Sequence, residues 1–204
     1  YGWNIPLSFS VSNRNTSFPQ PFNRYAIHPE WKWVTVHAGY TAMAFSPYTV
    51  NGHIFAGAGV ELDPGKKWKI SALYGRFLKA VEADTTHPGL RMPAFLRTGY
   101  GMKATYGDGR NFLDIILFHA EDDASSIAHP PDSIRVTPHE NLVVSIGGGK
   151  TVFKHINFRT ELASSAISKD TRAPKSANEN LLARSAFFFQ PRVSSSYYQA
   201  IKTS

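Results

Sequence analysis

The densest group of chemically capable side chains lies at residues 119–126, which read His-Ala-Glu-Asp-Asp-Ala-Ser-Ser. The carboxylates of Glu121, Asp122 and Asp123 are oxygen ligands of the kind that Ca²⁺ prefers, and loops supply such ligands readily. The segment lacks the Asp-x-Asp-x-Asp-Gly spacing of a calcium-binding loop. Acidic residues in a loop are usually just solvated. We therefore keep these residues and His119 as loop-cluster candidates and predict no metal site.

The same segment holds the residue types of an acyl-transfer enzyme. His119 could act with Asp122, Ser125 or His129. Such a site needs a nucleophile, a base and an orienting acid that converge in space, and proximity in sequence does not establish this. No Gly-x-Ser-x-Gly motif is present. We predict no catalytic residue, and an enzyme with its site in the outer loops stays the alternative.

A glycine run at residues 147–151, Gly-Gly-Gly-Lys-Thr, resembles the end of a phosphate-binding loop. The full Gly-x-x-x-x-Gly-Lys-Thr frame needs glycine at position 144, where this chain has Val144, and no helical pattern follows. Glycine inside a strand more often marks a bend or close packing. Nucleotide binding is therefore not predicted, and neither is any cofactor.

Another set of ionisable residues occupies alternate positions in strand-like segments. They are Glu61, Lys69, Lys103, Asp114, Arg159 and Glu161. We predict that they face the lumen of a barrel, where they would line a pore and set its ion preference. We favour a second interpretation of the same lumen-facing positions, in which the six side chains pair with one another across a hydrated or filled interior. His37, His53 and His155 are expected at the lumen or the membrane interface, not as metal ligands.

The elements that must position these residues are β-strands, because apolar and polar residues alternate with period two along most of the chain. At residues 3–11 the odd positions read Trp, Ile, Leu, Phe, Val, and residues 54–62 and 156–165 repeat the pattern. The patterned segments run to about ten residues or more, whereas strands of soluble proteins average about five or six. About ten residues is what a tilted strand needs to cross a bilayer. A soluble up-and-down barrel or a soluble sandwich is the alternative interpretation of the same pattern.

The connections alternate in length, as antiparallel strands in an outer-membrane barrel require. Short turns are predicted near residues 63–67, 107–110 and 151–154. Long loops are predicted near residues 13–30, 83–95, 121–141 and 167–195. The first of these loops lies on the short-turn side, so we expect it to cross or plug the lumen. Residues 1–204 would form a single barrel segment.

Composition excludes some classes of function. The chain has 204 residues, a formal net charge of +7 and a mean hydropathy of −0.26. No run of about 18 apolar residues is present, which rules out a transmembrane helix but not transmembrane strands. The basic residues are scattered and match no nucleic-acid motif, so we predict no nucleic-acid partner. Lipopolysaccharide, other outer-membrane lipid and other envelope proteins fit the charge better.

Several segments together resemble a known family. They are Trp31-Lys-Trp-Val-Thr-Val-His-Ala-Gly-Tyr, Phe45-Ser-Pro-Tyr-Thr-Val-Asn-Gly-His, Gly57-Ala-Gly-Val-Glu-Leu-Asp-Pro-Gly-Lys, Ala72-Leu-Tyr-Gly-Arg and Asn111-Phe-Leu-Asp-Ile-Ile-Leu-Phe-His-Ala-Glu-Asp-Asp. Over about residues 1–172 the chain is similar to large outer-membrane β-barrel proteins of the Bacteroidota. The resemblance implies an early portion of a longer barrel. It implies no activity and no site residue.

The sequence thus predicts an all-β fold, an antiparallel up-and-down transmembrane β-barrel of which about nine strands are visible. An open set of strands leaves unpaired backbone edges, which lipid does not tolerate. We therefore expect closure by further sequence, a partner chain or oligomerisation. The predicted function is a non-enzymatic porin-like channel, or a barrel subunit of an envelope assembly, in the outer membrane of a Gram-negative bacterium. A soluble all-β binding module is the other alternative.

Overall fold

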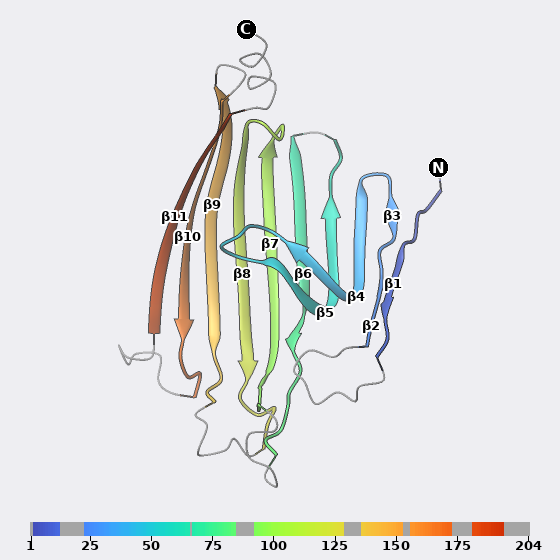
Figure 1. Ribbon diagram of the computed structural model, residues 1–204, viewed down its shortest axis with the longest axis vertical. Helices are drawn as coiled ribbons and strands as arrows, with labels where there is room; N and C mark the ends of the chain where they lie inside the picture. Colours follow the sequence, from blue (N-terminus) through green and yellow to red (C-terminus); the bar gives the residue numbers. More distant parts are fainter. Residues whose placement is uncertain are drawn as a thin grey trace.

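A single antiparallel sheet contains every strand of the chain that the computed structural model describes (Figure 1). The structure describes residues 2–12, 23–65, 67–84, 92–128, 136–152 and 156–172, and the backbone alone of residues 181–193. The strands are β1 (Leu7–Ser10), β2 (Arg24–Ile27), β3 (Glu30–Trp31), β4 (Val34–Ala44), β5 (Asn51–Leu62), β6 (Trp68–Leu78), β7 (Leu96–Gly107), β8 (Phe112–Asp123), β9 (Glu140–Val152), β10 (Ile156–Ser168) and β11 (Leu181–Val193).

The topology is up-and-down. The strand order is β1-β2-β4-β5-β6-β7-β8-β9-β10-β11, with β3 paired to β4 outside this path. All pairs are antiparallel, and within the described residues β1 and β11 are not paired with each other. Across the described ranges, no helix is long and apolar enough to cross a membrane. The all-β, antiparallel and meandering architecture predicted from the sequence is confirmed.

The two faces of the sheet differ, as period-two alternation requires. In β8, Asp114, Ile116 and Phe118 are buried, whereas Ile115 and Leu117 between them are exposed. The buried side is called the covered face, because part of the chain folds over it. The exposed side is called the open face.

The segment that covers the sheet is the tip of the β4–β5 hairpin, residues 45–50, here called the crossing hairpin. In Figure 1 it leaves the sheet plane and passes in front of β6, β7 and β8. A register shift between Ala42 and Ala44 marks the place where β4 departs from regular pairing with β5. Such irregularities bend a strand and change its direction. The hairpin therefore turns inward instead of extending the sheet.

The main hydrophobic cluster lies where the crossing hairpin meets the covered face. Its buried residues are Met43, Phe45, Val50, Phe55, Leu73, Ile116, Phe118, Ala120 and Val143. Glycines in the sheet make room for the hairpin. A Cβ atom on Gly101 would lie 2.9 Å from the Phe45 ring, and one on Gly59 would collide with the Met43 sulfur. The absence of these side chains lets the hairpin pack directly on the backbone of the sheet.

Two of the predicted short turns, residues 63–67 and 107–110, connect the strands where expected. Gly65 and Gly109 have φ values of +70° and +71°, in the left-handed region that glycine adopts at little cost. The carboxylate of Asp108 accepts hydrogen bonds from the backbone N–H groups of Asn111 and Arg110, which lowers the pKa of Asp108. The third turn is also short, because β9 ends at Val152 and β10 begins at Ile156.

Several predicted boundaries are wrong. The described residues form eleven strands where about nine are predicted, because β2 falls in the predicted loop 13–30 and β11 in the predicted loop 167–195. The predicted loop 121–141 is shorter, since β8 runs to Asp123 and β9 starts at Glu140. Strand β3 ends at Trp31 and β4 begins at Val34, and between them Lys32 has a φ of +54°.

These errors have physical reasons. β2 is only four residues long, too short to display a period. β11 carries consecutive phenylalanines and Pro191, which obscure alternation and suggest a break. Of the segment predicted to cross the lumen, residues 13–22 lie outside the described residues. The segment that does cross the sheet is residues 45–50.

The sheet glycines beneath the hairpin give a first prediction. Gly101→Ala places a methyl group 2.9 Å from the ring of Phe45 and 3.0 Å from that of Phe118. We expect a loss of about 1–3 kcal/mol in the free energy of unfolding, because overpacking forces buried rings to move. Denaturant titration followed by tryptophan fluorescence measures it.

Gly147→Ala is the matched control, since its Cβ would meet nothing nearer than the Thr160 carbonyl oxygen at 3.3 Å. We expect it to cost less than Gly101→Ala, because its Cβ meets one carbonyl oxygen instead of two aromatic rings and alanine also restricts the unfolded chain. Equal effects of the two substitutions would show that the hairpin does not rest on the Gly101 backbone.

Candidate functional site

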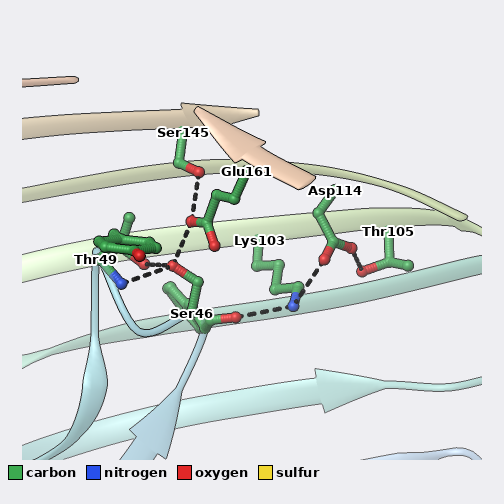
Figure 2. A network of polar contacts seen from close by, with 9 residues as sticks. Ser46, Thr49, Lys103, Thr105, Asp114, Ser145 and Glu161 are labelled. Carbon is green, nitrogen blue, oxygen red and sulfur yellow. Dashed lines mark hydrogen bonds and ion pairs between the residues drawn. The ribbon is translucent and has the colours of Figure 1, made fainter. Parts of the chain in front are cut away.

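The tip of the crossing hairpin is tied to the far strands of the sheet by a buried carboxylate. Ser46 Oγ donates a hydrogen bond of 2.6 Å to Glu161 Oε1 on β10 (Figure 2). Ser145 Oγ, on β9, donates one of 2.7 Å to the same oxygen. Glu161 is only 6% exposed and Ser145 1%. Hydrogen bonds to a buried carboxyl group are costly to lose, so these two bonds hold the tip of the hairpin against β9 and β10.

A second anchor lies on the central strands. Lys103 Nζ donates a hydrogen bond of 2.9 Å to the backbone carbonyl of Phe45 and lies 3.2 Å from Asp114 Oδ2. Thr105 Oγ1 donates one of 2.6 Å to Asp114 Oδ1. Both ionised side chains are largely buried, with exposures of 19% and 8%. Each charge is therefore compensated, as groups taken out of water require.

The two anchors and the hairpin form one site, drawn in Figure 2, that we call the strap network: Ser46, Thr49, Lys103, Thr105, Asp114, Ser145 and Glu161. Its carboxylates accept hydrogen bonds and its cation balances a carboxylate. This arrangement can hold the hairpin against the sheet, and it gives the covered face a polar surface.

Three of the six predicted lumen residues take part in this network, namely Lys103, Asp114 and Glu161. The other three lie nearer the short turns. Glu61 is 3.7 Å from His37 Nε2, and the Arg159 guanidinium lies 5.6 Å from the centre of the Phe112 ring. Lys69 Nζ donates a hydrogen bond of 2.6 Å to Asp63, which lowers the pKa of that exposed carboxyl.

All six alternate with open-face residues along their strands, so they share the covered face. Two of the predicted interface or lumen histidines are also placed. The Nδ1 atoms of His37 and His28 are 2.8 Å apart, and His53 is exposed on the hairpin side of β5. His155 lies outside the described residues.

The predicted loop cluster at residues 119–126 is not a cluster. His119, Glu121, Asp122 and Asp123 belong to β8, not to a loop, so successive side chains point to opposite faces. His119 Nε2 is 3.2 Å from Glu140 Oε1 on the open face. Asp122 is buried on the covered face. The acidic run was mistaken for a loop because strand interiors seldom carry three consecutive carboxylates.

Asp122 instead forms a bidentate ion pair. Its two oxygens accept hydrogen bonds of 2.7 and 2.8 Å from Arg97 Nε and Nη2, and it also accepts one from the His139 backbone N–H. Asp123 accepts hydrogen bonds from Ser125. Thus the structure does not bring together the predicted acyl-transfer residues His119, Asp122 and Ser125, and His129 lies outside the described residues.

Comparison with known proteins adds no further assignment. No protein-family model, curated protein or solved structure matches this chain. Among the described residues, no group of three or more His, Cys, Asp or Glu side chains is arranged to hold a metal ion. The site must therefore be interpreted from its own geometry.

Sequence reasoning missed Ser46 and Ser145, which hold the hairpin through Glu161, and Arg97, which binds Asp122. A signal was present for Ser46, since the turn-forming segment Ser46-Pro-Tyr-Thr separates two long alternating segments. Ser145 is a polar residue in an otherwise apolar run, which indicates a partner on the buried side. Nothing in the sequence indicates that this partner is shared with a residue about a hundred positions earlier.

The shared carboxylate gives a second prediction. Ser46→Ala and Ser145→Ala each remove one hydrogen bond to Glu161, and we expect each to lower the free energy of unfolding by about 1.5–3 kcal/mol. The double variant should lose more than the sum of the two, because Glu161 then loses both hydroxyl donors that hold it. Denaturant titration of the double-mutant cycle measures the coupling.

Ser71→Ala on the covered face of β6, outside the strap network, serves as the control and should change stability by less than about 0.5 kcal/mol. Strict additivity of the two network substitutions would contradict a common acceptor.

Proposed function

We propose that this chain forms wall strands of a non-enzymatic β-barrel in the outer membrane of a Gram-negative bacterium, as a porin-like channel or a barrel subunit of an envelope assembly. The observation that carries the proposal is the separation of charge between the two faces of the sheet. Membrane strands need an apolar face toward lipid and a polar face toward the lumen.

The open face is apolar and exposed over neighbouring strands. One row across it runs through the paired residues Ile70, Ala104, Ile115, Ile146 and Leu162. The next row contains Met102, Leu117 and Val144. Their exposed fractions include 53% for Ile115 and 51% for Met102. A continuous patch of this kind is a liability in water but is what a lipid-facing wall requires.

Over the middle of β7 and β8, the charged side chains lie on the covered face. On the open side, β7 from Thr98 to Tyr106 and β8 from Leu113 to Leu117 carry no Asp, Glu, Lys or Arg. The covered side of the same strands carries Arg97, Lys103, Asp114 and Asp122. Soluble sheets with one solvated face have the opposite arrangement, with the charges on the exposed side.

Strand length and aromatic placement agree with the same proposal. Strands β4 to β10 are 11 to 13 residues long, about the length that a tilted strand needs to cross the hydrocarbon layer. At the short-turn edge of the apolar rows, the rings of Trp68 and Tyr106 lie 4.9 Å apart on the open face. Tyr74 and Tyr100 pair at the other edge. Such aromatic rows are typical of membrane interfaces.

The crossing hairpin adds a constraint on the channel alternative. Because it spans the covered face from β5 to β10, it would lie within the lumen of any barrel that these strands help to form. A passage would then be narrowed and lined by the strap network. This favours a selective or gated path over a wide pore.

The proposal is tested by depth-dependent substitutions on protein extracted from membranes. Ile115→Arg puts a charge in the middle of the apolar rows, and Leu113→Arg puts it beside the aromatic edge formed with Tyr106. In lipid we expect a cost of about 2–4 kcal/mol for the first and about 0–1 kcal/mol for the second. The readouts are outer-membrane fractionation, the gel mobility shift between unboiled and boiled protein, and denaturant titration of the folded fraction in lipid vesicles.

In a soluble protein both positions would be water-exposed, and both substitutions would be nearly neutral. Recovery of a detergent-independent soluble protein, with Ile115→Arg as stable as Leu113→Arg, would sink the membrane proposal.

The hairpin's place in the lumen can be tested by cross-linking, because the chain has no cysteine. The hydroxyls of Ser46 and Ser145 bond to one oxygen, at 2.6 and 2.7 Å, so Ser46→Cys/Ser145→Cys can be bridged by a short bis-methanethiosulfonate. We expect high bridging yield and a small, steady single-channel conductance in planar bilayers. Reduction should release the hairpin and increase the conductance or its fluctuations.

Thr98→Cys/Ser145→Cys, with its cysteines on opposite faces, should not bridge. Efficient bridging of this control, or failure of the first pair in a folded protein, would contradict the position of the hairpin.

A further inference from the structure

A cavity of about 580 Å³ lies between the crossing hairpin and the covered face, on the long-loop side of the strap network. Its lining comes from the hairpin and from the ends of β6 and β10 and the starts of β7 and β9 that meet at that edge of the sheet. The volume is in the range of small-molecule binding sites, about 300–1,000 Å³. Of the residues considered above as lumen or interface candidates, His53 lines it, and none of the six ionisable lumen candidates does.

One part of the wall is apolar and held rigidly. Phe77 stacks on Phe55, with ring centres 5.4 Å apart, and packs edge-to-face on Phe118 at 5.5 Å. Val50 and Ile54 of the hairpin side complete this surface. Because the rings are fixed by one another, the surface is preorganised for a flat or chain-like apolar group.

The other part of the wall is polar and carries hydrogen-bond donors without lining carboxylates. Arg97 uses Nε and Nη2 to bind Asp122, so its Nη1 hydrogens are available to another acceptor, and its side chain is 34% exposed. His53 and His139 also line the cavity, and the lining contains no Asp or Glu.

Two buried polar atoms in this wall lack a partner among the described residues. They are Nδ1 of His139 and Oδ1 of Asn141. Buried polar atoms are nearly always hydrogen-bonded, so these two are the polar atoms of the lining residues that still lack a partner among the described residues. The Asn141 amide can present either its oxygen or its nitrogen, and a neutral imidazole can donate through Nδ1.

We propose that this cavity binds an amphipathic anion, a molecule with a carboxylate, sulfonate or phosphate head group on an apolar body. The head group would accept hydrogen bonds from Arg97 and His139, and the body would lie against Phe77 and Phe118. The excess of positive over negative residues in the chain, +7, favours an anion over a cation. The cavity belongs to the folded sheet itself, so the proposal stands or falls separately from membrane residence.

The test is isothermal titration of the folded protein with naphthalene-2-sulfonate and with neutral naphthalene-2-methanol, in dodecyl maltoside where detergent is needed. We expect the sulfonate to bind at least about tenfold more tightly than the alcohol, as loss of one charge-assisted contact predicts. Arg97→Gln/Asp122→Asn removes the cation and its buried counter-ion together, which avoids leaving an unpaired carboxylate. It should remove this preference while the alcohol binds as before.

The matched control is Arg159→Gln, which removes a covered-face cation near the short turns, 5.6 Å from the Phe112 ring. It should leave sulfonate binding unchanged. Phe118→Leu, which keeps an apolar side chain but removes the ring, should weaken both ligands. A folded protein that binds neither ligand, or an Arg97→Gln/Asp122→Asn variant that keeps the preference, would overturn the proposal.

Such anions can come from two sources, the lipids of an envelope and soluble carboxylates. Displacement of the bound sulfonate by a competitor of each kind distinguishes the two sources. Displacement of the sulfonate by octanoate but not by lysophosphatidylglycerol assigns the site to soluble carboxylates, and the reverse result assigns it to lipid. Displacement by the cation dodecyltrimethylammonium as effectively as by either anion would contradict the proposal.

Discussion

A buried carboxylate that needs hydrogen-bond donors organises this structure. Glu161 is almost fully enclosed on β10, and the hydroxyls of Ser46 and Ser145 both donate to it. Ser46 belongs to a hairpin that begins on strands several positions away in the sheet, so this contact draws the hairpin across the whole covered face. Without it, the buried carboxyl oxygen would lose one of its two hydroxyl donors, at a cost of about 1.5–3 kcal/mol. The hairpin is therefore part of the core and not a loose appendage.

The glycines of the covered face follow from the same constraint. A hairpin laid flat on a sheet must approach its backbone closely, and side chains beneath it would prevent this. Gly59 lies under Met43 at the end of β4 and Gly101 lies under Phe45 of the hairpin, so two large side chains meet the smallest sheet residues. The small–large complementarity explains why strands otherwise rich in aromatic and branched residues contain glycine at these positions.

Much of the fold could be predicted from the sequence, because a period of two places every side chain once the strand is recognised. The period of two alone is enough to assign Lys103, Asp114 and Glu161 to one face of the sheet. The hairpin crossing could not be predicted in this way, since it depends on a bulge after Ala42 and on a contact between residues 115 positions apart. The proposed loop cluster failed for the opposite reason. Composition near His119 suggested a loop, while pairing with β7 and β9 holds the segment as a strand.

The distribution of polar groups also connects the hairpin with the proposed surroundings of the sheet. Lys103 and Asp114 are central on the covered face, yet the adjacent open-face residues of the same strands are uncharged and exposed. A sheet with buried charge on its inner side and apolar residues outside reverses the usual order of a soluble protein. Such a wall is stable when the outer side meets lipid and every inner charge has a partner. The crossing hairpin supplies part of that partnership, through the Phe45 carbonyl and the Ser46 hydroxyl. Under the proposed membrane location, the inward fold of the hairpin and the apolar outer wall are thus two parts of one solution to placing charge in the sheet.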